Sequence, residues 1–586
     1  MSDDTTLTAS PATASEIMPP AEALTFEWDA WLSSRLAVIS MSLEEAAAWA
    51  IVIVLGLVSR LLLLGDPPLN LDESQQALQA YTLLHEGRIT YESAPILTNL
   101  TSLLFGLFTD GDLQARLVPA LSGVALILTP ILMRPVLGRW WCLLTAVVLL
   151  LSTTLLAASR TLSPTVPTAL CLAVTGLSAW RFGITHERGW LIAAVAAAAV
   201  GIGVDTSYVV GLIGLVLAYA IAEGEIFGRS HWWEPVARHG RLALAIGFGL
   251  AVALDTRLLM NTAGVQAGLI DPLWRWTGEI SRGAGLTAPV LLVLLDGAVL
   301  LLAIIGLIEY RRRSRQIRFL GTWLLVSLTL ASLMRMPDTR YLAQPLVPAA
   351  LLAGFGLLNL MTWIKEAGSL RTTVLGLLTL VPVVTAAFQI NAGLRANLSP
   401  WGSAGVVLVA GLLLAGILAF NLLRGLQLAA AFSTWLLVLL TLGSLAGAMR
   451  AVGAHGEDRG QLVVHNVVTP DMAYIREIAL KWYRAAPDGP LMVEPALQPL
   501  VAWELRDIPT VRFDNGANTA RGPRLLATPP AQVAPDTRTL RTIVGYAADW
   551  QTLSLQPSRV WRWVVTRESL VTLRPYGIVV VQPAGS

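Results

Sequence analysis

The chain changes from apolar to acidic at Asp66-Pro-Pro-Leu-Asn-Leu-Asp72-Glu73-Ser74-Gln75, directly after its first long apolar run. Two adjacent carboxylates at the mouth of an apolar helix are costly to place beside lipid, so such residues usually have a functional role. We therefore expect Asp72 and Glu73 to form the polar centre of a membrane-embedded site.

The composition indicates an integral membrane protein. Of the 586 residues, 55% are hydrophobic and 14% are charged, which exceeds the apolar share of ordinary soluble domains. The basic run Arg311-Arg-Arg-Ser-Arg315 lies between two apolar runs, where a cytoplasmic anchor explains it better than a nucleic-acid site. Cys142 and Cys171 both fall inside apolar segments, so neither a disulfide framework nor a thiolate metal site is expected.

Apolar runs long enough to cross a bilayer occur about thirteen times along the chain. They are expected near 46–64, 113–133, 141–158, 165–181, 190–204, 207–222, 242–256, 289–309, 319–335, 343–362, 372–390, 403–422 and 428–448. Arginine and lysine concentrate in alternate loops, which the positive-inside rule assigns to the cytoplasm. The N-terminus is therefore expected inside, and the loops that carry Asp72, Arg160, Asp271 and Asp338 are expected outside.

The sequence divides into three parts. Residues 1–26 are rich in Ser, Thr, Ala and Pro and predict a disordered cytoplasmic tail. Residues 27–449 form the membrane domain, and its first outer loop, 65–112, is long enough to hold amphipathic helices that lie flat on the membrane surface. Short apolar runs separated by proline in 450–586 predict a soluble exoplasmic α/β domain.

The helix expected to start at Asp72 has one apolar face, because Ala77, Leu78, Tyr81 and Leu84 recur at spacings of three and four. Gly87 is expected to end it. Asp205, in or beside a span, is expected either to face a cavity or to cap a short turn.

Further short motifs follow Asp72-Glu73-Ser74 in a characteristic order. They are His85-Glu86-Gly87, Ala115-Arg116-Leu117, Ser159-Arg160, Thr339-Arg340-Tyr341 and Trp503-Glu-Leu-Arg-Asp507. This order resembles the GT-C fold. More narrowly, it is similar to family 39, the protein O-mannosyltransferases and aminoarabinose transferases, and to the "flippase activity-associated" relatives of archaea and Chloroflexi-type bacteria.

The resemblance implies an inverting membrane glycosyltransferase of the plasma membrane. Such an enzyme moves a hexosyl or pentosyl group from a polyprenyl-phosphate donor to a glycan, lipid or protein acceptor on the exoplasmic side. Family members use an acid of the first outer loop as general base, and some use a divalent metal ion; no other cofactor and no nucleic acid is implied.

The residue chemistry agrees with these roles. A hydroxyl acceptor gains from a carboxylate within hydrogen-bond reach, and a departing phosphate gains from arginine or a cation. Asp72 is the expected base, and Glu73 is expected to support it or to bind a metal with His85. The expected ligands of the substrate phosphate are Arg116, Arg160, Arg340 and Tyr341.

Structural roles compete with each of these assignments. Asp72 with Gln75 also fits a helix N-cap with a capping-box partner, and the helix dipole stabilises Glu73 at a first turn in any case. An arginine near an outer helix end equally fits snorkelling to the lipid headgroups. A lone histidine on a surface helix, such as His85, is more often simply solvated.

Two family positions differ in this chain. Relatives commonly carry a His-Pro or His-Gly-Pro motif after the first amphipathic helix, where this sequence has Ser93-Ala94-Pro95. They also tend to carry an aspartate shortly after the arginine that corresponds to Arg160, and here Thr161-Leu-Ser-Pro164-Thr165 follows without an acid. A catalytically impaired accessory protein for export or assembly of a lipid-linked glycan is therefore the alternative prediction. A transporter is less favoured because inverted repeats with broken helices are not evident.

Overall fold

The computed structural model describes residues 41–367 with short gaps, the pair 466–467, and residues 471–583 with further gaps. The predicted tail at 1–26 and the predicted spans at 372–390, 403–422 and 428–448 lie outside the described residues.

Every predicted span within the described part coincides with a helix or with a pair of consecutive helices. The bounds are α2 Leu43–Leu61, α5 Asp112–Leu128, α7 Arg139–Leu151, α8 Thr153–Ser159, α9 Thr165–Thr185, α10 Arg188–Val204, α11 Thr206–Ile226, α12 Trp233–Asp255, α15 Thr287–Tyr310, α16 Arg315–Leu333 and α17 Thr339–Ala367. In the described residues, 6 helices are long and apolar enough to cross a membrane, or up to 7 when the bent pair α7–α8 counts as one span. The chain is therefore a multi-pass membrane protein, and the total of about thirteen spans stays a prediction.

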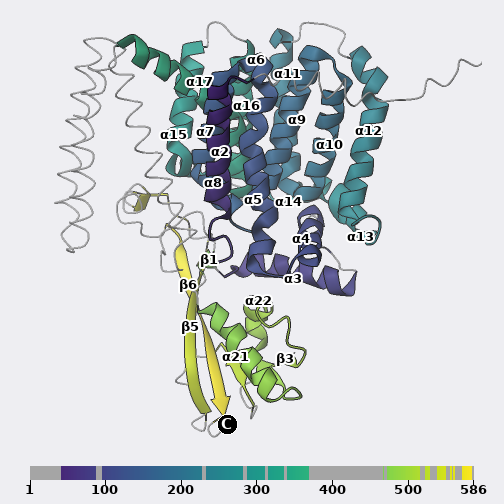
Figure 1. Cartoon of the computed structure of the whole chain (residues 1–586), viewed down its shortest axis with the longest axis vertical. Helices are drawn as coiled ribbons and strands as arrows, with labels where there is room; N and C mark the ends of the chain where they lie inside the picture. Colours follow the sequence, from purple (N-terminus) through teal and green to yellow (C-terminus); the bar gives the residue numbers. More distant parts are fainter. Residues whose placement is uncertain are drawn as a thin grey trace, which may run out of the picture. The chain divides into compact units, whose positions relative to one another are not determined.

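Shorter elements also belong to the described part of the membrane domain (Figure 1). They are α3 Leu71–Glu86, α4 Pro95–Leu107, η1 Thr129–Met133, α6 Arg134–Leu137, α13 Ala263–Val265, η2 Gln266–Ile270 and α14 Pro272–Gly278. Figure 1 shows α3 lying across the ends of the long helices rather than along them, as the amphipathic pattern predicts.

The expected span 141–158 is broken rather than continuous. The helices α7 and α8 meet at an angle of 64°, with Ser152 in an extended conformation between them. Asp296 of α15 accepts hydrogen bonds from the backbone amides of Thr153 at 2.8 Å and Thr154 at 3.2 Å. The break is therefore satisfied by a side chain from a distant helix, which hydropathy alone does not reveal.

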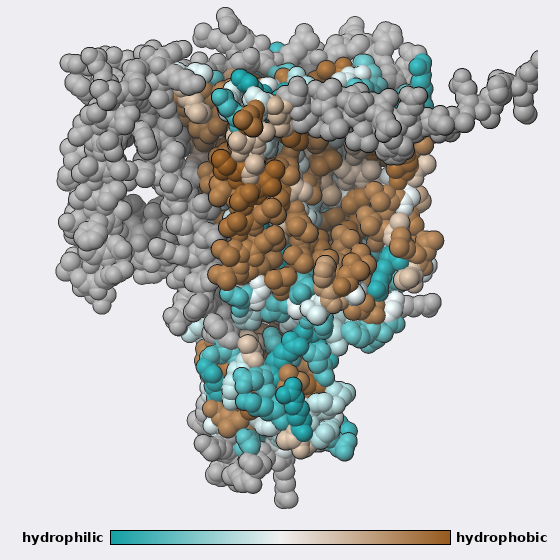
Figure 2. Space-filling view, viewed as in Figure 1, coloured by the Kyte–Doolittle hydropathy of each residue, from teal (hydrophilic) through white to brown (hydrophobic). Residues whose placement is uncertain are grey.

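Apolar side chains on the outside of the helices face where lipid is expected. Ile51, Val54 and Leu55 on α2 and Leu244 and Phe248 on α12 are each more than 49% exposed. Figure 2 shows the visible face of the helices covered by brown, apolar residues, whereas hydrophilic residues gather over the C-terminal part of the chain. An exposed apolar surface this extensive is stable in a bilayer and would aggregate in water.

The C-terminal part forms a mixed six-stranded sheet. Its order is β1-β5-β6-β4-β2-β3, with bounds β1 Asn466–Val467, β2 Leu491–Val493, β3 Val511–Phe513, β4 Arg524–Leu526, β5 Thr537–Asp549 and β6 Thr572–Pro583. The strand β2 is parallel to β3 and β4, and the other pairs are antiparallel.

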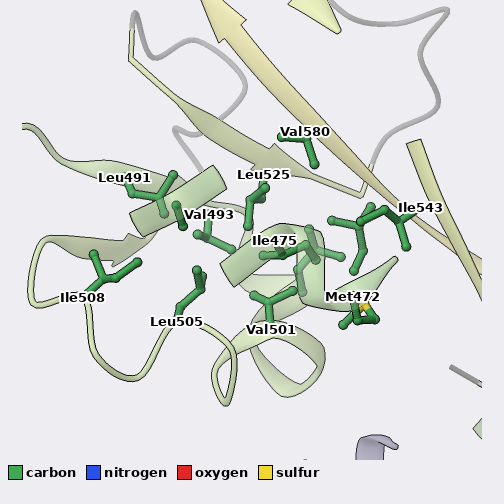
Figure 3. Close-up of a cluster of buried hydrophobic side chains, with 13 residues drawn as sticks. Met472, Ile475, Leu491, Val493, Val501, Leu505, Ile508, Leu525, Ile543 and Val580 are labelled. Carbon is green, nitrogen blue, oxygen red and sulfur yellow. The ribbon is translucent and has the colours of Figure 1, made fainter. Parts of the chain in front are cut away.

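Helices pack against this sheet. Their bounds are α21 Met472–Ala485, η3 Pro495–Leu497 and α22 Gln498–Val501. Figure 3 shows Ile475 of α21 among Val493, Leu525 and Val580 from neighbouring strands, and all of these side chains are fully buried. The domain therefore has a hydrophobic core of its own.

Candidate functional site

The two acids of the first loop stand on a helix whose start is fixed by a capping box. Asn70 Oδ1 accepts from the amide of Glu73, and Glu73 Oε2 accepts from the amide of Asn70, both at 3.0 Å. The N-cap of α3 is thus Asn70, not Asp72 with Gln75 as its partner, because the reciprocal pair Asn-x-x-Glu satisfies two orphan amides. Gly87, with φ +76°, ends the helix as predicted.

Glu73 forms a bidentate ion pair with Arg116 from α5. Arg116 Nε donates to Glu73 Oε1 at 2.9 Å, and one terminal nitrogen donates to Oε2 at 2.7 Å. Their side chains are 3% and 5% exposed, so the pair is withdrawn from water. Paired and parallel bonds of this kind are among the strongest that proteins make between charged groups.

Backbone groups make further hydrogen bonds with both members of the pair. The amide of Leu162 donates to Glu73 Oε1 at 2.7 Å, and Arg116 donates to the carbonyl oxygens of Leu64 at 3.1 Å and Pro68 at 3.2 Å. Burial by itself would raise the pKa of Glu73, but the Arg116 charge and the donated hydrogen bonds outweigh it and hold that pKa below its ordinary value. Glu73 is therefore a buried carboxylate that joins segments distant in the sequence.

Asp72 differs from its neighbour because its side chain is exposed. Successive residues of an α-helix point about 100° apart, so a helix that buries Glu73 turns Asp72 to another side. Of the two acids, Asp72 is the one that solvent can reach, while Glu73 fixes the helix that carries it.

Arg160 lies at the C-cap of α8 and closes the end of α2. Its guanidinium donates to the carbonyl oxygens of Ser59 at 3.0 Å, Leu62 at 2.8 Å and Leu63 at 3.4 Å. The side chain is buried, and its Nε has no partner among the described residues. Arg116 and Arg160 thus meet around the segment that follows α2, where they satisfy carbonyls that the helix leaves open.

Arg340 and Tyr341 belong to a second polar cluster, built from α14, α17 and the junction of α10 and α11. Arg340 pairs with Asp205 at 3.1 Å and lies 4.0 Å from Glu279, and the Tyr341 hydroxyl donates to Glu279. Thr206 Oγ1 also donates to Glu279, at 3.1 Å. The Arg340 side chain is 29% exposed, so this cluster opens to solvent.

The residues proposed for a metal do not fit one ion. His85 is exposed, and its Nδ1 donates to the carbonyl oxygen of Tyr81 at 2.9 Å. It lies twelve residues after Glu73 on α3, which is about 18 Å along the helix axis. Both oxygens of Glu73 are already occupied, and the part of the chain that the structure describes contains no group of three or more candidate ligands.

Sequence reasoning missed several members of these clusters. Glu279 is one of them, and its position three residues after Trp276, in a short polar stretch between apolar runs, is the signal that could have found it. Asp110 and Asp112 were not singled out either, and they bind the Trp503–Asp507 motif of the C-terminal domain. Two acids at the start of an apolar helix are such a signal, because acids favour helix starts.

Comparisons with known proteins agree with this architecture. The family described as dolichyl-phosphate-mannose-protein mannosyltransferase matches residues 92–248. The fold is similar to that of ArnT from Cupriavidus metallidurans bound to undecaprenyl phosphate, with a TM-score of 0.54 and 17% identity over 92% of this chain and 98% of that chain. The archaeal oligosaccharyltransferase AglB from Archaeoglobus fulgidus, in complex with an inhibitory peptide and a dolichol-phosphate, gives a TM-score of 0.46 and 12% identity over 82% and 67%. No curated protein sequence matches the chain.

The class of protein follows from the fold. The chain has the GT-C fold of polytopic membrane glycosyltransferases, which confirms the predicted fold class. Within that class, its matched segment is similar to the protein mannosyltransferase family, as the order of motifs predicted. The narrower likeness to flippase-associated relatives stays a prediction.

Proposed function

We propose that this protein is a membrane glycosyltransferase that moves a sugar from a polyprenyl-phosphate donor to an acceptor on the exoplasmic side. The observation that carries the proposal is the first turn of α3, where exposed Asp72 stands beside Glu73, which is buried and clamped by Arg116. A catalytic carboxylate needs both access to substrate and a rigid support. The similarity to ArnT bound to undecaprenyl phosphate supports the donor class.

In the proposed reaction, Asp72 accepts the proton of an acceptor hydroxyl. The hydroxyl oxygen forms a bond to the anomeric carbon while the bond from that carbon to the donor phosphate oxygen breaks. The sugar is inverted at that carbon, and the polyprenyl phosphate leaves with the bonding electrons. Negative charge therefore builds on the phosphate, where an arginine stabilises it.

Arginines from the two polar clusters are the candidates for that phosphate role. Arg340 is the most accessible of them, because 29% of its side chain is exposed and Asp205 is a partner that a phosphate can replace. Arg160 keeps one unpaired nitrogen but is buried, and Arg116 is committed to Glu73. We assign the primary phosphate contact to Arg340, with Tyr341 beside it, and a supporting role to Arg160 and Arg116.

No step of this mechanism runs through a divalent ion, since Glu73 and His85 cannot share one.

An accessory role in export or assembly of lipid-linked glycans is the second candidate function. It is favoured by the hydrogen bonds that Arg116 and the terminal nitrogens of Arg160 already make within the protein, and by the absence of an acid directly after Arg160.

The decisive experiment replaces Asp72 by Asn in the full-length protein, reconstituted in liposomes with a radiolabelled polyprenyl-phosphate hexose. We expect transfer or donor hydrolysis to fall by about 100-fold or more, as for loss of a general base, with an unchanged melting temperature. Asp271→Asn is the matched control, because that acid pairs with Arg275 on the partly exposed surface. Equal turnover by Asp72→Asn and wild type would exclude Asp72 as base. A wild type that consumes no labelled donor while remaining folded would favour the accessory role.

A further inference from the structure

One short segment of the C-terminal domain contacts the helices α3 and α4 of the first loop and the start of α5. Trp503 Nε1 donates to Asp112 Oδ1 at 2.9 Å, at the first residue of α5. The Trp503 ring stacks on Phe105 of α4 with a centroid distance of 5.8 Å. The Arg506 guanidinium lies 5.8 Å from the ring centre of Tyr81 on α3. Trp503 and Arg506 together therefore touch α3, α4 and α5.

Arg506 is held as firmly as a core residue. Its Nε lies 3.2 Å from Asp110 Oδ2, and a terminal nitrogen donates to the Asp110 carbonyl oxygen at 2.5 Å. The guanidinium also lies over the Trp503 ring at 3.7 Å, which is close for a cation above an aromatic face. Its side chain is 0% exposed.

This burial distinguishes the contact from the other charged pairs of the domain. Arg541 and Asp471 form a pair whose side chains are 45% and 40% exposed, and such surface pairs contribute little. Trp503, by contrast, is 1% exposed and belongs to a hydrophobic cluster that includes Ala77 and Ala80 of α3. A buried aromatic residue that fills such a cluster is the kind of anchor that dominates an interface.

The contact leads directly to the Glu73–Arg116 pair. Asp112 lies one helical turn before Arg116, which interacts electrostatically with both Asp112 and Glu73. The cluster around Trp503 also contains Leu162, whose amide donates to Glu73. Arg116 and Glu73, the pair that supports the helix carrying Asp72, therefore each interact with a residue that Trp503 contacts.

We propose that Trp503 and Arg506 are positioning residues that fix the start of α5 and the face of α3, so that Arg116 clamps Glu73 and Asp72 is presented to substrate. The inference rests on the proposed transferase function for its catalytic consequence. Its structural part, the ordering of α3 and α5 by the C-terminal domain, stands separately. The Trp503–Asp507 motif thereby has a function at the site, although it lies about 430 residues after Asp72 in the sequence.

The test uses Trp503→Phe, which keeps the stacking on Phe105 but removes the bond to Asp112, and Arg506→Lys, which keeps the charge but removes the planar fork. Arg541→Ala, in the same domain but outside the contact, is the control. Hydrogen exchange of peptides covering 69–86 and 110–117 is measured in the full-length protein in nanodiscs. We expect faster exchange in both peptides for Trp503→Phe and Arg506→Lys. For Arg541→Ala we expect exchange at the wild-type rate.

Kinetics separate positioning from a general loss of fold. Under the proposed function, kcat falls about 10-fold in both variants while KM for the lipid donor changes less than 2-fold, because a misplaced base slows chemistry without removing donor contacts. If Trp503→Phe does not fold, Asp112→Ala removes the same bond from α5 and is expected to give the same pattern.

Two results overturn the inference: exchange that stays at the wild-type rate, or faster exchange with kcat unchanged in an active enzyme. A wild type without transferase activity, combined with faster exchange in the variants, supports the ordering of α3 and α5 and rejects the proposed function instead.

Discussion

Glu73 and Arg116 form a buried, bidentate ion pair between α3 and α5, although 43 residues separate them in the sequence. Removing two charges from water costs several kcal/mol, and only close geometry with additional hydrogen bonds offsets that cost. The backbone groups of Asn70, Leu162, Leu64 and Pro68 supply those bonds. The pair is therefore stable as a unit, and each partner alone would be an uncompensated buried charge.

Arg116→Ala is expected to destabilise the protein by about 3–5 kcal/mol, because it leaves the Glu73 carboxylate buried without a cation. The measurement is the melting temperature and the yield of monodisperse protein in detergent. Arg275→Ala, which breaks an exposed pair with Asp271 on α14, is the control and is expected to cost less than about 1 kcal/mol. A loss for Arg116→Ala no larger than that of the control would show that the pair does not hold the loop.

The pH dependence of this pair has a definite sign. The pKa of Glu73 is lowered in the fold, so its contribution to stability is present above the ordinary value of about 4.3 and is lost as the pH falls through the lowered pKa. Glu73→Gln removes that contribution at neutral pH. We expect the melting temperatures of wild type and Glu73→Gln to differ clearly at pH 7, and the difference to shrink progressively as the pH falls below about 4.3. A difference that stays constant down to pH 3 would contradict a lowered pKa.

Glu504 is expected to change the stability of the protein with pH in the direction opposite to that of Glu73. It is 7% exposed, and its burial together with the Asp112 carboxylate raises its pKa to about 7. A raised carboxyl pKa means that the fold binds a proton which the unfolded chain releases at about pH 4.3, so stability falls as the pH rises from about 4.3 to 7.

Glu504→Gln removes this penalty, which is at most about 4 kcal/mol for a pKa raised from about 4.3 to about 7. The variant is expected to melt at a higher temperature than wild type at pH 8 and at the same temperature near pH 4. Glu477→Gln, on the exposed surface of α21, serves as the control and is expected to show no such dependence. If Glu504→Gln melted at the wild-type temperature at pH 8, the Glu504 carboxylate would be solvated in the folded protein and its pKa would not be raised by burial.

The sequence predicts the long helices well because burial in lipid imposes one simple requirement on them. A run of apolar residues of the right length has few alternatives to a helix, so α9 and α16 follow the hydropathy pattern closely. The GT-C class is predicted for a different reason, because the order of short motifs from Asp72 to Trp503 resembles that of the family.

The pairings within the site depend on contacts that no local pattern encodes. Nothing near Glu73 indicates Arg116 as its partner, and nothing near Ser152 indicates that Asp296 caps the helix that follows it. The N-cap at Asn70 is a different case. The pattern Asn70-x-x-Glu73 fits a capping box, but in the sequence alone Asp72 with Gln75 fits one equally well.

The helices α15 and α17 pack closely at two glycines, where the absence of a side chain lets the two backbones meet. A Cβ added to Gly306 would overlap the carbonyl oxygen of Leu352, and one added to Gly356 would overlap that of Leu302 and lie 3.0 Å from the amide nitrogen of Gly306. Small residues at such crossings bring helices together in membranes, where no hydrophobic effect does so.

Gly356→Ala is therefore expected to cost about 1–3 kcal/mol through forced separation of the two helices. Gly249→Ala on α12 is the matched control, since nothing lies within 4 Å of an added Cβ there. Alanine has the better helix propensity, so this control is expected to be neutral or slightly stabilising. The melting temperatures of both variants in the same detergent decide the matter: equal values would mean that α15 and α17 are not packed backbone against backbone.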